Sequence, residues 1–411
     1  MLKHAVYFNL LGSLDENEPE WRATLAGLLV LRLVDWQLES DGWQVPTDWT
    51  AVESIRRAVM EVSEGDPIRA TLLNALDTAS GENVERGEVS RRLMPYGRAL
   101  NFNGRWALAA DVFATVDRIA GPRVDPRLVI EANIALGAAS RRLGNWDASA
   151  HAYAHAAYIA NTVADEAGLL QAEVGVANTH IARGNIPAAE ALLDSVVEKA
   201  RAGGFNAVLG MALHSRTTAA HQRGLFADAV RFGHDALEAT ADPTSRDGIL
   251  EDIAAAFVGM GMHDAARDSH LIVAVTSQSQ WVRWQATINL MELAAIDGQE
   301  EVFDNYAREL GEAALDPRLR SYYLLFLGVG QQRFGRHSAA EASLASAREF
   351  ATKNQLHQIA YEASMAIAAL ESGKSATISR SVAPYSVEVP QRVREIAAAL
   401  HGVRETAVGS P

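Results

Sequence analysis

The chain has 411 residues, no cysteine and a formal net charge of −14. The absence of cysteine excludes disulfides, thiol nucleophiles and cysteine-based zinc sites. The negative charge argues against nonspecific binding to nucleic acid or to an anionic membrane, because such binders present a basic face. With 48% hydrophobic and 21% charged residues, the composition is that of a folded protein and not of a disordered chain.

Targeting and membrane-spanning segments are not expected. The first residues contain only a short, interrupted apolar run and no cleavage site of the signal-peptide type. The longest apolar stretch near the start, residues 25–31, is far shorter than the ~20 residues that span a bilayer. These features predict a cytoplasmic protein.

Residues 1–88 are expected to form an N-terminal helical cap. Apolar spacing predicts a helix over residues 15–40, a second that is capped by Thr47 or Asp48 and ends at Val62, and a third that starts at Pro67. Four of the eight tryptophans lie in this region: Trp21, Trp36, Trp43 and Trp49. We interpret them as the packed cover of an open repeat end, and the alternative is an aromatic docking pocket.

The rest of the chain is organised around one recurring turn. At each copy a helical pattern ends, a glycine follows, and a second helical pattern begins at once. The turn glycines are Gly104, Gly144, Gly184, Gly224, Gly261, Gly298 and Gly335. Three consecutive spacings are 40 residues and the next three are 37 residues. A fixed period of this length predicts an array of helical hairpins.

The helices that flank each turn carry small residues at fixed positions. Seven residues before the glycine stand Gly97, Gly137, Ala177, Thr217, Ala254 and Gly328, and five residues after it stand Ala109, Ser149, Ala189, Ala229, Ala266 and Ala340. Two antiparallel helices approach closely only where side chains are small, so these positions are expected to face each other. Met291 and Phe303 are the two exceptions, and both belong to the Gly298 hairpin.

This pattern resembles the tetratricopeptide repeat family. The residues that carry the resemblance are Leu136-Gly137, Leu143-Gly144-Asn145-Trp146, Tyr153 and Ala156, and then Leu327-Gly328, Gly335, Ala340 and Ala347. The resemblance covers residues 89–372, about seven repeats, and implies an all-α, right-handed superhelical solenoid of antiparallel helix pairs. The long repeats are similar to those of peptide-sensing bacterial regulators and of large ATP-dependent transcription activators. The chain has neither a P-loop nor a helix-turn-helix domain, so only the sensor-like part is shared.

Residues 373–411 are expected to form a C-terminal loop and a capping helix. A helix over residues 356–370 precedes them, and residues 374–389 lose the helical period. Pro390 then starts a short helix, Gln391–Leu400, and the residues from Arg404 onward are expected to fray.

The resemblance implies that the first helix of each hairpin lines a concave groove that holds a partner peptide. The candidate groove residues are Arg91, Arg98, Asn101, Arg141, Arg142, Asn178, His214, His221 and Asn289. The arginines suggest that the first repeats take the acidic part of a partner, while Glu251, Asp252 and Glu292 make the middle repeats acidic. The alternatives are that these residues form solvated helix faces or that the arginines pair with acids on adjacent helices.

Other sites receive little support. The family's carboxylate clamp needs a lysine where Val174 stands, although Asn178 fits it. His151 and His155 have the spacing of a two-histidine metal face but are expected on the outer side, so no metal is predicted. His214 and His221 could sense pH or bind a carboxylate. No catalytic or nucleotide-binding motif is present, and neither an enzyme activity nor a cofactor is expected.

The sequence therefore predicts a scaffold or adaptor that binds a protein or peptide segment. The alternative is a regulatory sensor that responds to a peptide or small ligand and controls a partner protein. Self-association into a homo-oligomer is compatible with either function.

Overall fold

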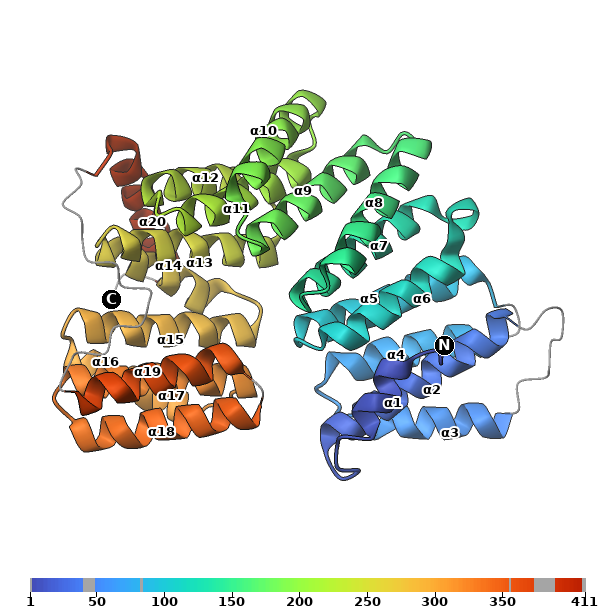
Figure 1. Ribbon diagram of the computed structural model, residues 1–411, viewed down its shortest axis with the longest axis horizontal. Helices are drawn as coiled ribbons and strands as arrows, with labels where there is room; N and C mark the ends of the chain where they lie inside the picture. The colour runs from blue at the N-terminus through green and yellow to red at the C-terminus, as the bar shows by residue number, and fades with distance from the viewer. Residues whose placement is uncertain (1, 40–48, 82–83, 355, 373–388, 409–411) are drawn as a thin grey trace. The chain divides into compact units, whose positions relative to one another are not determined.

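The computed structural model describes residues 2–39, 49–81, 84–354, 356–372 and 389–408. Within these ranges all regular structure is α-helical and no strand occurs, which confirms the predicted all-α class (Figure 1). None of the described helices has both the length and the apolar character needed to cross a membrane. The helices are α1 (Ala5–Leu11), α2 (Pro19–Glu39), α3 (Trp49–Met60), α4 (Pro67–Ala79), α5 (Arg86–Phe102), α6 (Trp106–Val124), α7 (Pro126–Arg142), α8 (Trp146–Thr162), α9 (Glu166–Ala182), α10 (Ile186–Gly203), α11 (Asn206–Gln222), α12 (Phe226–Ala239), α13 (Pro243–Gly259), α14 (His263–Thr276), α15 (Gln280–Ile296), α16 (Glu300–Glu312), α17 (Pro317–Arg333), α18 (His337–Lys353), α19 (His357–Glu371) and α20 (Gln391–Val408).

The chain divides into two compact units, residues 1–203 and 204–411, and each is described by itself. The division falls at the glycine pair Gly203-Gly204, which the sequence marks as a break between repeats. Unit 1 contains α1–α10 and unit 2 contains α11–α20. Within each unit, helices that follow one another in the chain pack against each other, with the exception of α20, which packs against α14 and α12.

All seven predicted turns are present and join helix pairs. The pairs are α5–α6, α7–α8, α9–α10, α11–α12, α13–α14, α15–α16 and α17–α18. Each turn glycine has a left-handed backbone, with φ between +70° and +76°. The residue after the glycine donates its N–H to the carbonyl five residues earlier, as Asn145 does to Ser140 at 2.9 Å. This bond satisfies a carbonyl that the helix end would otherwise leave without a partner, so the turn is a local property of the sequence.

The small residues before the turns lie against large side chains of the second helix, and not only against the small residues expected opposite them. A Cβ atom added to Gly137 would lie 2.7 Å from the Tyr153 ring, and one added to Gly97 would lie 2.6 Å from the Phe113 ring. The exceptional Phe303 is fully buried, and its ring lies against Gly330, where an added Cβ would approach to 2.2 Å. The small residue that makes room for the Phe303 ring is therefore Gly330, on the first helix of the next hairpin, α17.

The turn geometry predicts opposite effects of two substitutions. Gly144→Val should destabilise the protein by about 1–2 kcal/mol, because a β-branched residue is strained at the φ of +71° that Gly144 adopts. Ala164, between α8 and α9, also has a left-handed backbone with φ +54°, so Ala164→Gly should stabilise by about 0.5 kcal/mol. Urea unfolding followed by circular dichroism measures both. A Gly144→Val protein as stable as wild type would contradict this account of the turn.

The N-terminal cap contains one helix that the sequence analysis missed. The segment α1 precedes the predicted helices and packs against α2 and α6. The Tyr7 side chain is buried and its hydroxyl lies 3.0 Å from that of Tyr96. The helix predicted from Pro67 is confirmed as α4, with Asp66 as its N-cap.

Neither of the two cap tryptophans whose side chains the structure describes, Trp21 and Trp36, is fully buried. The buried stripe of α2 runs through residues such as Val30, Leu31 and Val34, while Trp36 is 41% exposed. The interpretation of Trp36 as a packed cover residue is therefore wrong, because it lies on the side of α2 away from that stripe. Trp43 and the proposed caps Thr47 and Asp48 lie outside the described residues, and so does the Trp49 side chain.

The C-terminal region differs from the expectation in length and position. The helix expected at 356–370 is present as α19. The predicted loop, except Val389, lies outside the described residues. The final helix extends to Val408 instead of ending at Leu400, and it packs against α14 and α12. Its buried residues Val393, Ile396 and Leu400 form an apolar stripe, which explains the attachment.

Candidate partner-binding faces

The first helices of successive hairpins are joined by polar side chains that lie one repeat apart in sequence. Such bonds occur between α5 and α7 in unit 1, and between α11, α13 and α15 in unit 2. We call these two surfaces the unit 1 face and the unit 2 face. Polar groups at equivalent positions of neighbouring helices thus share one side of the array within each unit.

On the unit 1 face, two of the predicted arginines pair with acids of the next first helix. Arg91 Nη1 donates to the Asp125 carboxylate at 2.8 Å, and its Nε donates to Glu88 on its own helix at 3.1 Å. Arg98 pairs with Glu131. More than half of each arginine side chain remains exposed. These pairs match the alternative in which the arginines bind acids on adjacent helices, and each such exposed pair contributes little stability.

The other two arginines contact neutral groups. Arg142 Nη1 donates to the Asn101 amide oxygen at 2.9 Å. Arg141 is half-buried and hydrogen-bonds to Tyr153. Burial raises the pKa of the Tyr153 hydroxyl, and the neighbouring Arg141 charge lowers it in part. The Arg141 Nε atom is buried without a hydrogen-bond partner among the described residues.

The unit 1 face carries more positive than negative side chains. Its acids are Glu88, Asp125 and Glu131, and its arginines are Arg91, Arg92, Arg98, Arg141 and Arg142. The five positive charges exceed the three negative ones by two, in a chain of net charge −14. Asn178 is half-buried on α9 in the same unit. This face therefore stays locally positive even though two arginines are paired.

The unit 2 face combines acids with amide and imidazole groups. Asp252 on α13 receives hydrogen bonds from His214 Nε2 at 3.0 Å and from the Thr218 hydroxyl at 3.1 Å, both on α11. The neighbouring Glu251 receives one from the Asn289 side-chain amide on α15 at 2.7 Å. The half-exposed His214–Asp252 pair is accessible to a ligand.

One member of this network was not foreseen from the sequence. His270 on α14 is buried, and its Nδ1 lies 2.9 Å from Glu251. Glu251 therefore connects α13, α14 and α15. His270 lies on a second helix inside an apolar pattern, so no sequence signal distinguishes it from a core residue. His214 and His221 have separate surroundings, because the His221 ring packs edge-on against Phe226 with centroids 5.4 Å apart.

The small crevice between α15 and α17 is not a ligand pocket. It is lined by Glu292, Phe326 and Arg333, among others, and its volume is about 10 Å³. That is the space of about one water molecule. Recognition at the unit 2 face would therefore use exposed side chains of the helices and not this crevice.

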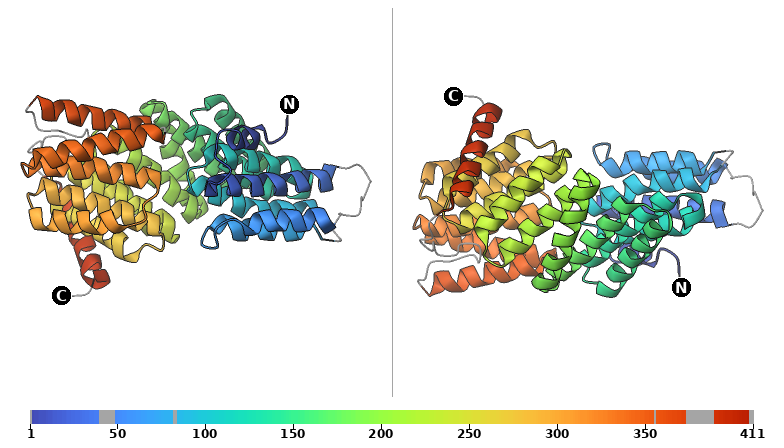
Figure 2. Two further views of the ribbon diagram at one scale, coloured as in Figure 1. Left: turned by 90° about the horizontal axis from the view of Figure 1, so that it is seen from below. Right: turned by 90° about the horizontal axis from the view of Figure 1, so that it is seen from above.

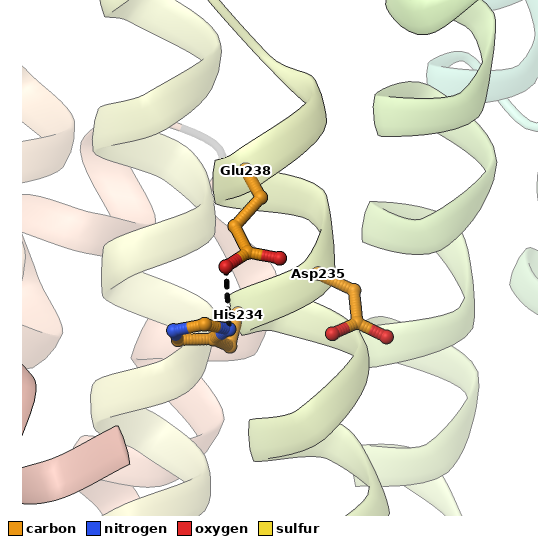
Figure 3. Close-up of side chains that lie close together, drawn as sticks. All are labelled: His234, Asp235 and Glu238. Carbon is orange, nitrogen blue, oxygen red and sulfur yellow. Dashed lines mark ion pairs between the residues drawn. The ribbon is translucent and has the colours of Figure 1, made fainter. Parts of the chain in front are cut away.

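One group of side chains in the described part of the chain could approach a metal ion. His234, Asp235 and Glu238 all lie on α12, with potential ligand atoms within 4.8 Å of one another (Figure 3). The Glu238 side chain is 69% exposed, and its contact with His234 is a 3.9 Å ion pair within one helix turn. Three ligands on one open helix surface leave the site unprotected from water, so we assign no metal to it. His155 pairs with Asp117 at 3.6 Å.

These observations define a helical-hairpin repeat protein with two polar first-helix faces. No protein-family model matches the chain, and no curated protein matches it. Among solved structures it is similar to the Rap conjugation gene regulator of plasmid pLS20 in complex with the Phr* peptide, with 12% identity, a TM-score of 0.45, and coverage of 86% of this chain and 98% of that one.

Two further structures show similar levels of likeness. A Rap protein complexed with competence and sporulation factor aligns with 12% identity and a TM-score of 0.36, over 85% of this chain and 98% of that chain. A signal transduction ATPase with numerous domains and a tetratricopeptide repeat sensor, from Pyrococcus horikoshii, aligns with 13% identity and a TM-score of 0.41, over 99% of this chain and 65% of that chain. At such scores these likenesses carry no argument, and the assignment to the helical-repeat class rests on the turns and helix pairs described above.

Proposed function

We propose that this protein is a non-catalytic interaction module, located in the cytoplasm, that binds a peptide or protein segment along its first-helix faces. The observation that supports this function is the alignment of half-exposed polar groups on neighbouring first helices, at intervals of one repeat. Amide, guanidinium and carboxylate groups in such a row can bond the backbone and charged side chains of an extended segment.

The two faces favour different parts of a partner. On the unit 1 face, a partner carboxylate can bond Arg141 and Arg142, or replace Glu131 on Arg98. On the unit 2 face, the carboxylates of Glu251 and Asp252 suit a basic side chain or an amine. The partner expected at unit 1 therefore carries an acidic stretch.

A regulatory sensor is the second candidate. The specific observation in its favour is the Glu251 network, because one carboxylate on a ligand-facing helix also holds His270 and Asn289. A ligand that withdraws Glu251 from these bonds would change the contacts between three helices. That change controls a partner protein only if ligand binding and partner binding are energetically coupled, which binding and hydrogen-exchange measurements can determine.

Charge reversal tests the proposed function. The double variant Arg98→Glu and Arg141→Glu should weaken the binding of a fluorescein-labelled glutamate-rich peptide at least ~10-fold, about 1.4 kcal/mol, because both changes remove positive charge from the unit 1 face. Fluorescence anisotropy measures the Kd. The double variant Arg123→Glu and Arg201→Glu changes the net charge by the same amount and is the control for charge alone, since both arginines lie exposed on second helices of the same unit, α6 and α10.

The melting temperature of each variant is measured in parallel, because Arg141 also bonds Tyr153. Equal weakening by the control pair Arg123→Glu and Arg201→Glu would indicate long-range charge and contradict recognition at this face. Unchanged affinity of a folded double variant would place the partner elsewhere.

A further inference from the structure

The last helix, α20, belongs to no hairpin and is attached to the surface of unit 2. It packs against α14 and α12, which are second helices of their hairpins (Figure 2, red). From Gln391 to Ala407, three side chains are buried, namely Val393, Ile396 and Leu400, and the others are exposed or half-buried. These three residues stand at i, i+3 and i+7, so a single stripe of α20 makes the apolar contact.

A charged clamp lies at the end of this stripe. The Asp268 side chain on α14 is 12% exposed, and both of its carboxylate oxygens are bonded to α20. One oxygen accepts from His401 Nδ1 at 2.8 Å and the other from Arg404 Nε at 3.0 Å. A carboxylate in an otherwise apolar contact favours a helix that brings a donor to this position, and disfavours an apolar helix that would leave it unpaired.

An open cleft adjoins this contact. A cleft of about 370 Å³ opens between the start of α14 and α20, and is lined by Ala265, Asp268, Ala397 and His401, among others. The contact of α20 thus combines one apolar stripe, one specific clamp and an adjoining open cleft.

We propose that the face of α12 and α14 under α20 is a docking site for an amphipathic helix, and that α20 occupies this site until a partner helix displaces it. The partner helix carries apolar residues at i, i+3 and i+7, followed within about one turn by an arginine or histidine that reaches Asp268. Because α20 belongs to the same chain, its effective concentration is high, and the partner competes with a tethered occupant. This inference does not depend on binding at the first-helix faces.

A labelled peptide of residues 389–408 tests the site in the full-length protein. The variant Ile396→Asp places a charge in the apolar stripe and should vacate the site. The peptide is expected to bind this variant at least 10-fold more tightly than wild type, whose own α20 competes. Adding Asp268→Asn should weaken binding to the vacated protein at least 5-fold, and a control peptide with the Ile396→Asp change should not bind.

Three results would overturn the proposal. The first is absence of peptide binding to a folded Ile396→Asp protein, and the second is equal binding to that variant and to wild type. The third is a dimer that sedimentation detects for the wild-type protein but not for the Ile396→Asp variant. In that case the helix in the site would come from a second copy of the chain.

Hydrogen exchange of the wild-type protein tests displacement even if the variant fails to fold. Amides of α20 should exchange at least 10-fold faster than those of α14, because α20 undocks without unfolding the hairpins. Equal protection of both helices would show that α20 leaves only on global unfolding and would overturn the proposal.

Discussion

Gly175→Val is expected to destabilise unit 1 by about 3 kcal/mol, and to lower its melting temperature by roughly 6–12 °C. The Tyr153 ring of α8 is 2% exposed and lies against both Gly137 of α7 and Gly175 of α9. A Cβ atom on Gly175 would lie 2.1 Å from the ring, so either the ring or α9 must move. Thermal unfolding followed by circular dichroism measures the effect.

Two further variants separate this steric effect from helix propensity. Gly402→Ala, on α20, is the control, because no atom lies within 4 Å of the added Cβ and no loss of stability is expected. Combining Gly175→Val with Tyr153→Leu should cost less than the sum of the single changes, since the smaller side chain makes room. If the stability losses of the two single changes simply add, or if Gly175→Val melts at the wild-type temperature, the Tyr153 ring does not limit the approach of α9.

His4→Leu is expected to destabilise unit 1 by about 3 kcal/mol at pH 7, because it removes one partner from a buried ionic cluster. The His4 side chain is 2% exposed and lies between Asp111, at 2.5 Å from Nδ1, and Asp35, at 3.2 Å from Nε2. Burial alone would lower the pKa of His4, but hydrogen bonds and charge from Asp111 and Asp35 outweigh it and raise the pKa to about 9. His4 therefore ties α1 to α2 and α6 as a charged imidazolium.

The pH dependence gives a sharper test of the same cluster. The folded-state pKa of His4 lies above its ordinary value of 6.5, so the stabilisation is complete below pH 6.5 and is lost as the pH rises through about 9. The pKa of Asp35 is lowered, because bonds from His4 and Arg118 outweigh its burial, so acid weakens the cluster only when Asp35 protonates.

Urea unfolding at pH 6.5, 8 and 9.5 should show a difference between wild type and His4→Leu that shrinks with rising pH. The control is His151→Leu, because His151 is an exposed histidine on α8 in the same unit. A difference that stays constant with pH would mean that His4 stabilises the cap by packing and not by charge.

The hairpin architecture follows from local sequence. The seven turn glycines and most of the small residues next to them could be assigned without a structure, because a left-handed helix end and a close helix crossing each demand particular residues at fixed spacing. Helix starts at Pro67 and Pro390 follow from the same local rules. The end of α20 does not, because it was predicted at Leu400 and the helix continues to Val408.

The partners of the charged residues could not be assigned in this way. Arg91, Arg98 and Asn289 were predicted as face residues, but their bonds to Asp125, Glu131 and Glu251 depend on the spacing and rotation of neighbouring helices. A helical period indicates which side of a helix is polar, not which group of the next helix it meets. The roles of the candidate residues in partner binding remain predictions that the charge-reversal variants test.

By itself, the sequence determined the helix pairs, their turns and their polar faces, since these depend on contacts within one or two repeats. Only the tertiary structure decided the attachment of the two ends of the chain. His4 meets Asp111 across 107 residues, and His401 meets Asp268 across 133 residues. In both cases one buried or nearly buried charge selects its partner by distance and desolvation after the repeats have assembled, and no periodic pattern in the chain encodes that choice.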